Sequence, residues 1–306
     1  MIELRTLGTW EVRIVDGTKT RDMRLEPKRM ALLVYLAVEH RMNVVARDQL
    51  IAIFWPDLDE AAARSALRQS LHYLGSRLGS EAIAGRGTPE VGLSPDRVCC
   101  DAVEFERFLD GSEPVRALRR FSGSFLPGFY YARQSRDFEE WVETQRQWLT
   151  ERAFEAALTL AEDEAVRGNT TGQTHWLKRA LQLEPFREDV LRDLVDVYAR
   201  TGNRATAVQT IRRFAQHLSS HYRATLSPQT GEVLKQLERE IAVGTRDTRA
   251  ETFRRMRSLE EELNQEMART AELLKQLRNV VGPGVPRTVA AGGEGDARSF
   301  ITGAVR

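Results

Sequence analysis

The sequence DEAAARSALRQSLHYLGSRLG, residues 59–79, has the periodicity of an amphipathic helix. Its apolar residues recur at steps of three or four and therefore share one face: Ala63, Leu67, Leu71, Leu74 and Leu78. The residues outside that face are cationic or form hydrogen bonds: Arg64, Ser65, Arg68, Gln69 and His72. Between Ala61 and Ser80 there are three arginines and no acidic residue. Such a face suits DNA phosphates and base edges, but a solvated surface helix that lacks acids fits this stretch equally well.

Two shorter helices are predicted before this stretch. The first covers residues 27–40 and begins with a proline, which suits the first position of a helix. The second covers residues 46–55 and is followed by Pro56. Asp57, with Glu60 three residues later, resembles a capping box at the start of the third helix.

Strand patterns flank the three helices. Residues 2–26 alternate between apolar and polar side chains and contain a hairpin turn signal, Asp16-Gly17. Residues 80–100 read as a compact β-hairpin region with Arg86 near its tip. The order of a sheet, three helices and a hairpin predicts a winged helix-turn-helix domain with an additional N-terminal sheet. In that layout the third helix enters the major groove and the wing reaches the backbone or the minor groove.

This layout gives each polar residue an expected role. Arg64 and Arg68 would contact phosphates or guanine, and Gln69 would pair with adenine. Shorter contacts, or contacts to the DNA backbone, are expected from the remaining candidates: Ser65, His72, Lys28, Arg29 and the wing residue Arg86. Each of these side chains could instead be solvated without any ligand.

The composition limits where such a site can lie. The chain has 306 residues with 42% hydrophobic residues, enough for about two domains plus extensions. The net charge is +1, and residues 1–100 carry 14 Lys/Arg against 13 Asp/Glu, so a nucleic-acid site must be a local patch. The adjacent Cys99 and Cys100 are expected to be small buried residues of a protein in a reducing compartment. With no long apolar run and no signal peptide, a cytoplasmic location is expected.

The segment from Leu25 to Gly79 resembles the DNA-binding half of the SARP/AfsR regulators of bacteria. The marks of the resemblance are, in order, Pro27-Lys28-Arg29, Arg47-Asp48-x-Leu50, Trp55-Pro56, Ala63-Arg64 and Leu67-Arg68-Gln69. It extends over roughly residues 1–243 and includes the loop Gly123-Ser124-Phe125-Leu126-Pro127-Gly128-Phe129. The resemblance implies a bacterial transcriptional activation domain after the winged helix, binding to direct repeats near promoters, and recruitment of RNA polymerase.

The chain departs from the family pattern at three positions. Tyr73 and Gly75 stand where the family often has arginines, which predicts a weaker phosphate contact there. Gly75 in the interior of this helix is also expected to reduce helix stability by about 1 kcal/mol relative to alanine. Ala46 stands where a serine usually caps the second helix, a loss of about 1 kcal/mol at that helix start.

Residues 101–243 are predicted to be mostly helical and contain an internal repeat. A shift of 34 residues places Gly168 on Gly202 and Asn169 on Asn203, and apolar positions on apolar positions, such as Leu160 on Leu194. This step, with a glycine between two helices, is typical of TPR units, which stack to bury their apolar faces and leave a concave groove. The three large tryptophans of this region are expected in the core: Trp141, Trp148 and Trp176.

Residues 244–281 form a charged helical run, and residues 282–306 are Gly-rich and expected to be disordered. Within 254–280 two series seven residues apart approximate a heptad seam: Met256, Leu263, Thr270 and Leu277, with Leu259, Glu266, Leu273 and Val280. The polar members make a marginal coiled coil. The helix could pair two subunits as a homodimer, or pack back on the TPR-like region.

No enzymatic or cofactor motif is present. His217 and His221 are four residues apart on a predicted helix, but no third metal ligand is evident. The predicted fold class is an α+β winged helix-turn-helix domain (1–100), an all-α TPR-like domain (101–243) and a C-terminal helical extension. The predicted function is sequence-specific binding of double-stranded DNA with recruitment of RNA polymerase or another transcription protein. The alternative is a protein-interaction scaffold whose winged helix does not bind DNA.

Overall fold

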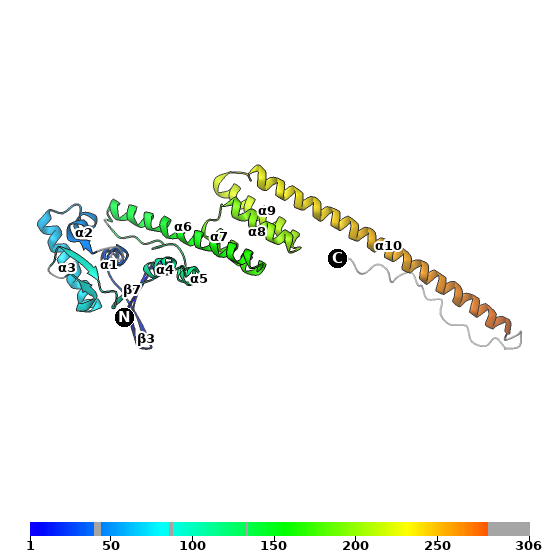
Figure 1. Ribbon diagram of the computed structural model, residues 1–306, viewed down its shortest axis with the longest axis horizontal. Helices are drawn as coiled ribbons and strands as arrows, with labels where there is room; N and C mark the ends of the chain where they lie inside the picture. Colours follow the sequence, from blue (N-terminus) through cyan, green and yellow to red (C-terminus); the bar gives the residue numbers. More distant parts are fainter. Residues whose placement is uncertain (40–43, 86–87, 133, 281–306) are drawn as a thin grey trace, which may run out of the picture. The chain divides into compact units, whose positions relative to one another are not determined.

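The computed structural model (Figure 1) describes the following residues: 1–39, 44–85, 88–132 and 134–280. The predicted wing-tip residue Arg86, His40 at the end of the first predicted helix, and the expected disorder of 282–306 lie outside these residues. The chain forms two compact units, Met1–Glu238 and a second that begins at Arg239. Within the described residues, no helix combines the length and apolar composition that crossing a bilayer requires.

The N-terminal sheet has four strands in the order β3-β2-β1-β7. Its first three strands form an antiparallel meander: β1 (Ile2–Arg5), β2 (Glu11–Asp16) and β3 (Lys19–Met23). The predicted hairpin turn at Asp16-Gly17 is confirmed, since Asp16 pairs with Lys19 and Gly17 has a φ of 57°. A positive φ is a conformation that glycine adopts without steric strain.

The region 80–100 is only partly the hairpin that its pattern predicts. A short 3-10 helix, η1 (Ser80–Ala82), precedes β5 (Ile83–Ala84), which pairs antiparallel with β6 (Glu90–Leu93) and forms the hairpin. The third strand of the region, β7 (Val98–Cys100), instead pairs in parallel with β1, with Ile2 opposite Val98. The prediction was wrong here because Val98 and Cys100 bury their side chains in the core that β1 also enters.

Three helices lie between the sheet and the hairpin, as predicted: α1 (Pro27–Glu39), α2 (Arg47–Phe54) and α3 (Glu60–Leu78). Helix α1 is apolar around most of its circumference because it contacts α2, α3, α4, β6 and β7. The residue predicted to cap the start of α3 is wrong. Asp59, not Asp57, caps α3 by accepting a hydrogen bond from the Ala62 amide at 2.9 Å.

Helix α2 begins without a side-chain cap, as its sequence predicts. Ala46 has the extended backbone of a cap residue (φ −65°, ψ 137°) and accepts no hydrogen bond through its side chain. Ala46→Ser is therefore expected to stabilise the chain by about 1 kcal/mol, measured by urea denaturation. The control is Ala52→Ser inside α2, where serine is expected to be neutral or unfavourable. An unchanged Ala46→Ser midpoint would contradict the prediction.

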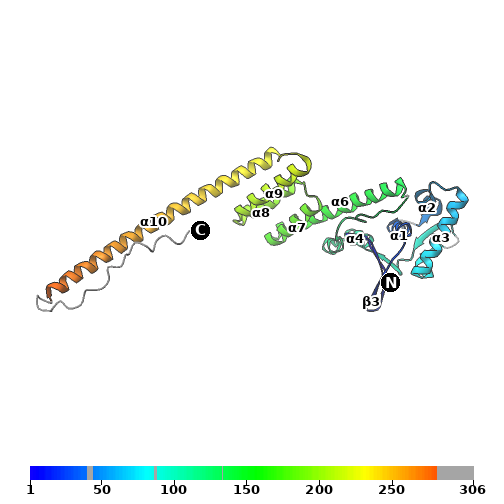
Figure 2. The ribbon, with the colours of Figure 1, turned by 180° about the vertical axis from the view of Figure 1, so that it is seen from behind.

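Seven helices follow the N-terminal domain within the described residues: α4 (Asp101–Asp110), α5 (Pro114–Arg120), α6 (Arg136–Val166), α7 (Thr170–Leu183), α8 (Glu188–Arg200), α9 (Arg204–Tyr222) and α10 (Pro228–Val280). Each of α6, α7 and α8 packs against the next helix in the chain (Figure 2). The turn that the sequence repeats after 34 residues recurs in the structure. Gly168 and Gly202 have φ angles of 71° and 80°, and Asn169 and Asn203 are the N-cap residues that follow them.

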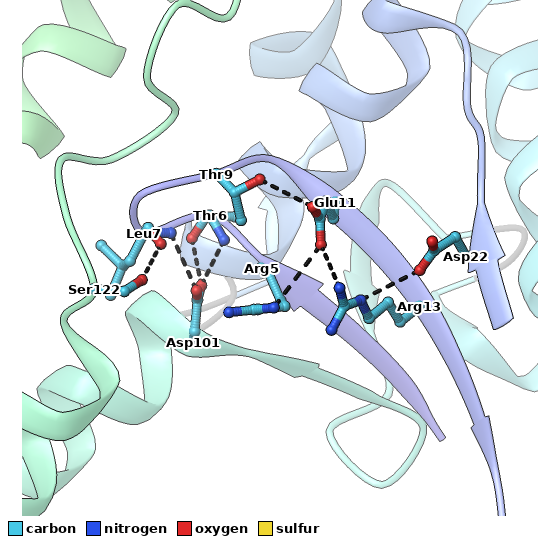
Figure 3. A network of polar contacts seen from close by, with 9 residues as sticks. All are labelled: Arg5, Thr6, Leu7, Thr9, Glu11, Arg13, Asp22, Asp101 and Ser122. Carbon is cyan, nitrogen blue, oxygen red and sulfur yellow. Dashed lines mark hydrogen bonds and ion pairs between the residues drawn. The ribbon is translucent and has the colours of Figure 1, made fainter. Parts of the chain in front are cut away.

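A carboxylate holds the sheet against the helical half (Figure 3). Asp101, the first residue of α4, accepts hydrogen bonds from the Thr6 amide at 2.8 Å, the Thr6 hydroxyl at 2.6 Å and the Leu7 amide at 3.1 Å. The Ser122 hydroxyl donates to the Leu7 carbonyl from the opposite side. Leu7 also forms a β-bridge with Phe125. The turn after β1 is therefore fixed by residues about a hundred positions away in the sequence.

An aromatic cluster joins the first helices of the chain to α6. Its members are Tyr35, Phe54, Phe125, Phe129, Tyr131, Phe138 and Trp141. Trp141 also donates from its indole nitrogen to Glu39 of α1 at 2.8 Å. The prediction of a core position holds for Trp141 and Trp176, which pack against the core. It is wrong for Trp148, which is 48% exposed and whose indole nitrogen donates to the buried Glu106 at 2.7 Å.

Candidate nucleic-acid interface

The helix α3 separates apolar from polar side chains as its sequence predicts. Ala63, Leu67 and Leu74 are 2% exposed or less and anchor the helix to its domain. The other side of α3 carries the five predicted contact residues of this helix. Ser65 is half-buried, and the other four are exposed: Arg64, Arg68, Gln69 and His72. A rigid, well-anchored helix with an exposed polar face has the construction of a recognition helix.

Arg64 is not the unpaired cation that its local sequence indicates. Its guanidinium lies 2.9 Å from Glu60 and 3.2 Å from Asp48, which belongs to α2. Glu60 lies one turn earlier at the start of α3, whereas Asp48 comes from α2, so the sequence of α3 alone does not reveal the second acid. These pairs are exposed to solvent and therefore weak.

Arg68 has a second arginine as its electrostatic neighbour. Burial, followed by the positive charge of Arg68, lowers the pKa of Arg47. Arg47 begins α2 and donates to the carbonyls of Thr88 at 2.7 Å and Gly85 at 3.2 Å. It thereby ties the hairpin to the helix pair, and the two cations together favour an anion.

Arg47 is the candidate residue that sequence reasoning missed. The sequence marks it only by its place in the motif Arg47-Asp48-x-Leu50. Its hydrogen-bond acceptors lie about forty positions later in the chain, so its local sequence does not reveal them. The hairpin also requires a glycine at position 85. Gly85 has a φ of 76°, and a Cβ placed on it would lie only 2.4 Å from the Glu90 carbonyl oxygen. The hairpin β5–β6 lies beside α3, which β5 contacts.

The cations at the start of α1 are engaged with aromatic rings. The Lys28 amine lies 4.8 Å from the Trp55 ring centre, and burial lowers its pKa while Asp57 acts in the opposite direction. The Arg29 guanidinium lies 3.9 Å from the ring centre of Tyr73 and 2.6 Å from Glu26. Tyr73, which replaces an arginine of the family pattern, thus contacts a cation. Lys28 and Arg29 have structural roles that their sequence positions did not indicate.

The helical half contains a cavity of about 290 Å³ among α6, α7 and α8. Its apolar lining includes Leu158, Leu177 and Val190. Four acids also line it, Glu162, Asp189, Asp193 and Asp196, together with one arginine, Arg200, which lies 2.8 Å from Asp196. Burial, followed by the charge of Asp189, raises the pKa of Asp193. The cavity therefore has an excess of negative charge and an apolar wall.

The histidines of α9 lie close together. The ring centres of His217 and His221 are 6.2 Å apart, and His221 Nδ1 lies 2.9 Å from the His217 carbonyl oxygen. In the part of the chain that the structure describes, no cluster of three or more His, Cys, Asp or Glu residues has the arrangement of a metal site.

Comparison with known proteins identifies the helical half. Residues 113–242 match the family described as bacterial transcriptional activator domain (BTAD). No curated protein matches the chain. The solved structure of Mycobacterium tuberculosis EmbR in complex with a low-affinity phosphopeptide is similar to 78% of this chain, with a TM-score of 0.52 and 21% sequence identity.

The EmbR comparison concerns the fold. The chain spans 65% of the length of the EmbR chain that it matches. The match covers more of the chain than the activator domain does, and it therefore extends beyond residues 113–242. Taken with the family match of residues 113–242, this fold comparison supports the resemblance of the chain to the SARP/AfsR type of bacterial transcriptional regulators.

Proposed function

We propose that the chain binds specific DNA sequences, with α3 in the major groove and the β5–β6 hairpin on the backbone. The observation that carries the proposal is the exposed polar face of α3 around Arg68, beside a hairpin that Arg47 anchors. Arg68 and Gln69 are the side chains best suited to base edges. Arg64, Ser65 and His72 flank them, and Arg47 adds a phosphate contact.

Arg68→Ala is expected to weaken specific binding by about 1–3 kcal/mol, or about 5- to 150-fold. The expected loss follows from removing a guanidinium that contacts a base or phosphate. A duplex is first selected from a random library with the wild-type chain. The affinities of wild type and variant for that duplex are then compared by gel-shift titration at one salt concentration, because phosphate contacts depend on salt.

The matched control is Arg77→Ala on the same helix. Arg77 is also exposed but lies nine residues after Arg68, about two and a half helical turns, and therefore faces the opposite direction. The control is expected to bind like the wild type. Equal losses for both variants would indicate nonspecific charge attraction, and an unchanged Arg68→Ala affinity would remove Arg68 from the interface. If wild type passes through heparin at low salt and selects no duplex, the scaffold function is favoured.

The activating contact belongs to the BTAD region in this proposal. The acidic cavity among α6, α7 and α8 fits a basic segment of RNA polymerase or another transcription protein. The aromatic cluster between α2 and α6 would place this surface at a set distance from bound DNA. A chain that binds its operator but leaves run-off transcription by RNA polymerase unchanged would contradict this second part of the proposal.

A further inference from the structure

The second unit of the chain exposes an apolar stripe on α10. Seven large apolar side chains within residues 253–274 are 53–63% exposed: Phe253, Met256, Leu259, Leu263, Met267, Leu273 and Leu274. They occupy the a, d and e positions of the heptad in which Met256 is an a residue. Every described side chain from 251 to 276 is exposed. A stripe of this length on a surface helix marks an interaction site.

We propose that this stripe binds the α10 helix of a second copy of the chain in antiparallel orientation, with the twofold axis between Asn264 and Gln265. In this arrangement Met256 of one copy packs against Leu273 of the other, and Phe253 packs against Leu274. Leu259 meets Thr270, and Leu263 meets Glu266. Each contact occurs twice, as in any twofold interface between identical chains.

The position of Glu266 decides the orientation. Glu266 occupies a d position, so a parallel dimer in register would place the two Glu266 carboxylates against each other inside the seam. Two like charges without a cationic partner in a desolvated seam are strongly unfavourable. In the antiparallel arrangement each Glu266 instead faces Leu263, and its stem lies along the seam while its carboxylate extends to solvent.

The charges at the g positions decide the register. In antiparallel helices g positions meet g positions, and here they are Arg255, Glu262, Arg269 and Gln276. The proposed register pairs Glu262 of each copy with Arg269 of the other, which gives two ion pairs. A shift by one heptad in one direction pairs Glu262 with Glu262. The opposite shift pairs Arg269 with Arg269. Like charges at these positions disfavour both alternatives.

The complementarity of the stripe with itself identifies the occupant as a second copy. An unrelated partner would require neither the alternation of Arg255, Glu262 and Arg269 nor matched apolar residues at both ends of the stripe. The inference does not depend on the proposed DNA binding, since all of its residues belong to the second unit.

Disulfide trapping in the full-length chain tests the orientation and the register. Met256→Cys and Leu273→Cys are made singly, mixed in equal amounts under reducing conditions, and then oxidised. We expect a covalent dimer from the mixture and almost none from either variant alone. The native cysteines do not interfere, because burial raises the pKa of Cys99 and of Cys100 to about 12 and leaves little reactive thiolate. Oxidised wild-type chain is the control.

The other outcomes overturn the inference. Efficient trapping of Met256→Cys with itself would show a parallel dimer. A dimeric mass by light scattering without any trapped product would show a different register or a different surface. A monomeric mass of the wild-type chain at tens of micromolar would show that the stripe does not bind a second copy.

A charge exchange gives a second, independent readout. Glu262→Arg alone or Arg269→Glu alone is expected to weaken dimerisation about tenfold, since each converts two ion pairs into two repulsions. The double variant Glu262→Arg with Arg269→Glu is expected to recover the wild-type dissociation constant, measured by sedimentation. In a parallel dimer Glu262 would meet Met267, so neither single variant would break an ion pair between the copies. Single variants that dimerise like the wild type would contradict the antiparallel orientation, and a double variant that fails to recover would contradict the proposed register.

Discussion

Phe138→Ala is expected to reduce the free energy of unfolding by about 3–5 kcal/mol, the loss typical of a buried phenylalanine. Phe138 is fully buried, and its ring centre lies 5.2 Å from Phe54 and 5.5 Å from Trp141. The first of these neighbours belongs to α2 and the second to α6. Removing the ring leaves a cavity at the junction of the N-terminal domain and the helical half.

This prediction concerns cooperativity as well as stability. Because Phe138 contacts both halves, urea denaturation is expected to give coincident transitions by circular dichroism and tryptophan fluorescence in the wild type. Phe138→Leu keeps most of the buried volume and is expected to lose less than about 1.5 kcal/mol. The exposed Tyr130, at 69%, supplies the control Tyr130→Ala, expected within about 0.5 kcal/mol of wild type. A Phe138→Ala loss as small as that of the control would show that the cluster does not join the halves.

Asp101→Ala is expected to reduce stability by about 3 kcal/mol or more. Asp101 accepts four hydrogen bonds from N–H and O–H donors, three from Thr6 and Leu7 and one from the Ala102 amide at 2.9 Å. Alanine would leave the amides of Thr6 and Leu7 without acceptors. Each unsatisfied, partly buried donor is unfavourable by about 1–3 kcal/mol.

Asp101→Asn separates the loss of an acceptor from the loss of the side chain. Asparagine keeps one oxygen but directs an amino group at a donor, so a loss between those of wild type and Asp101→Ala is expected. Asp96→Ala, an exposed residue of the preceding turn, is the control and is expected to change stability by less than about 0.5 kcal/mol. Equal stabilities of Asp101→Ala and wild type in urea denaturation would contradict the role of this carboxylate.

The candidate interface was only partly predictable. The exposed face of α3 followed from its spacing, and Arg68 and Gln69 lie where the pattern placed them. The pairing of Arg64 with Asp48 did not follow from this spacing, because Asp48 belongs to α2. Arg47 was missed for the same reason, since the carbonyls that orient it are those of Gly85 and Thr88.

The sequence by itself determined the features that depend on near neighbours. The helices α1 to α3, the turn at Asp16-Gly17 and the uncapped start of α2 follow from side chains within a few positions of one another. Only the tertiary structure decided that β7 joins β1 and that Asp101 holds the turn after that strand. These contacts join residues more than ninety positions apart, and a local pattern contains no information about which distant strand or donor will complete a buried side chain's contacts.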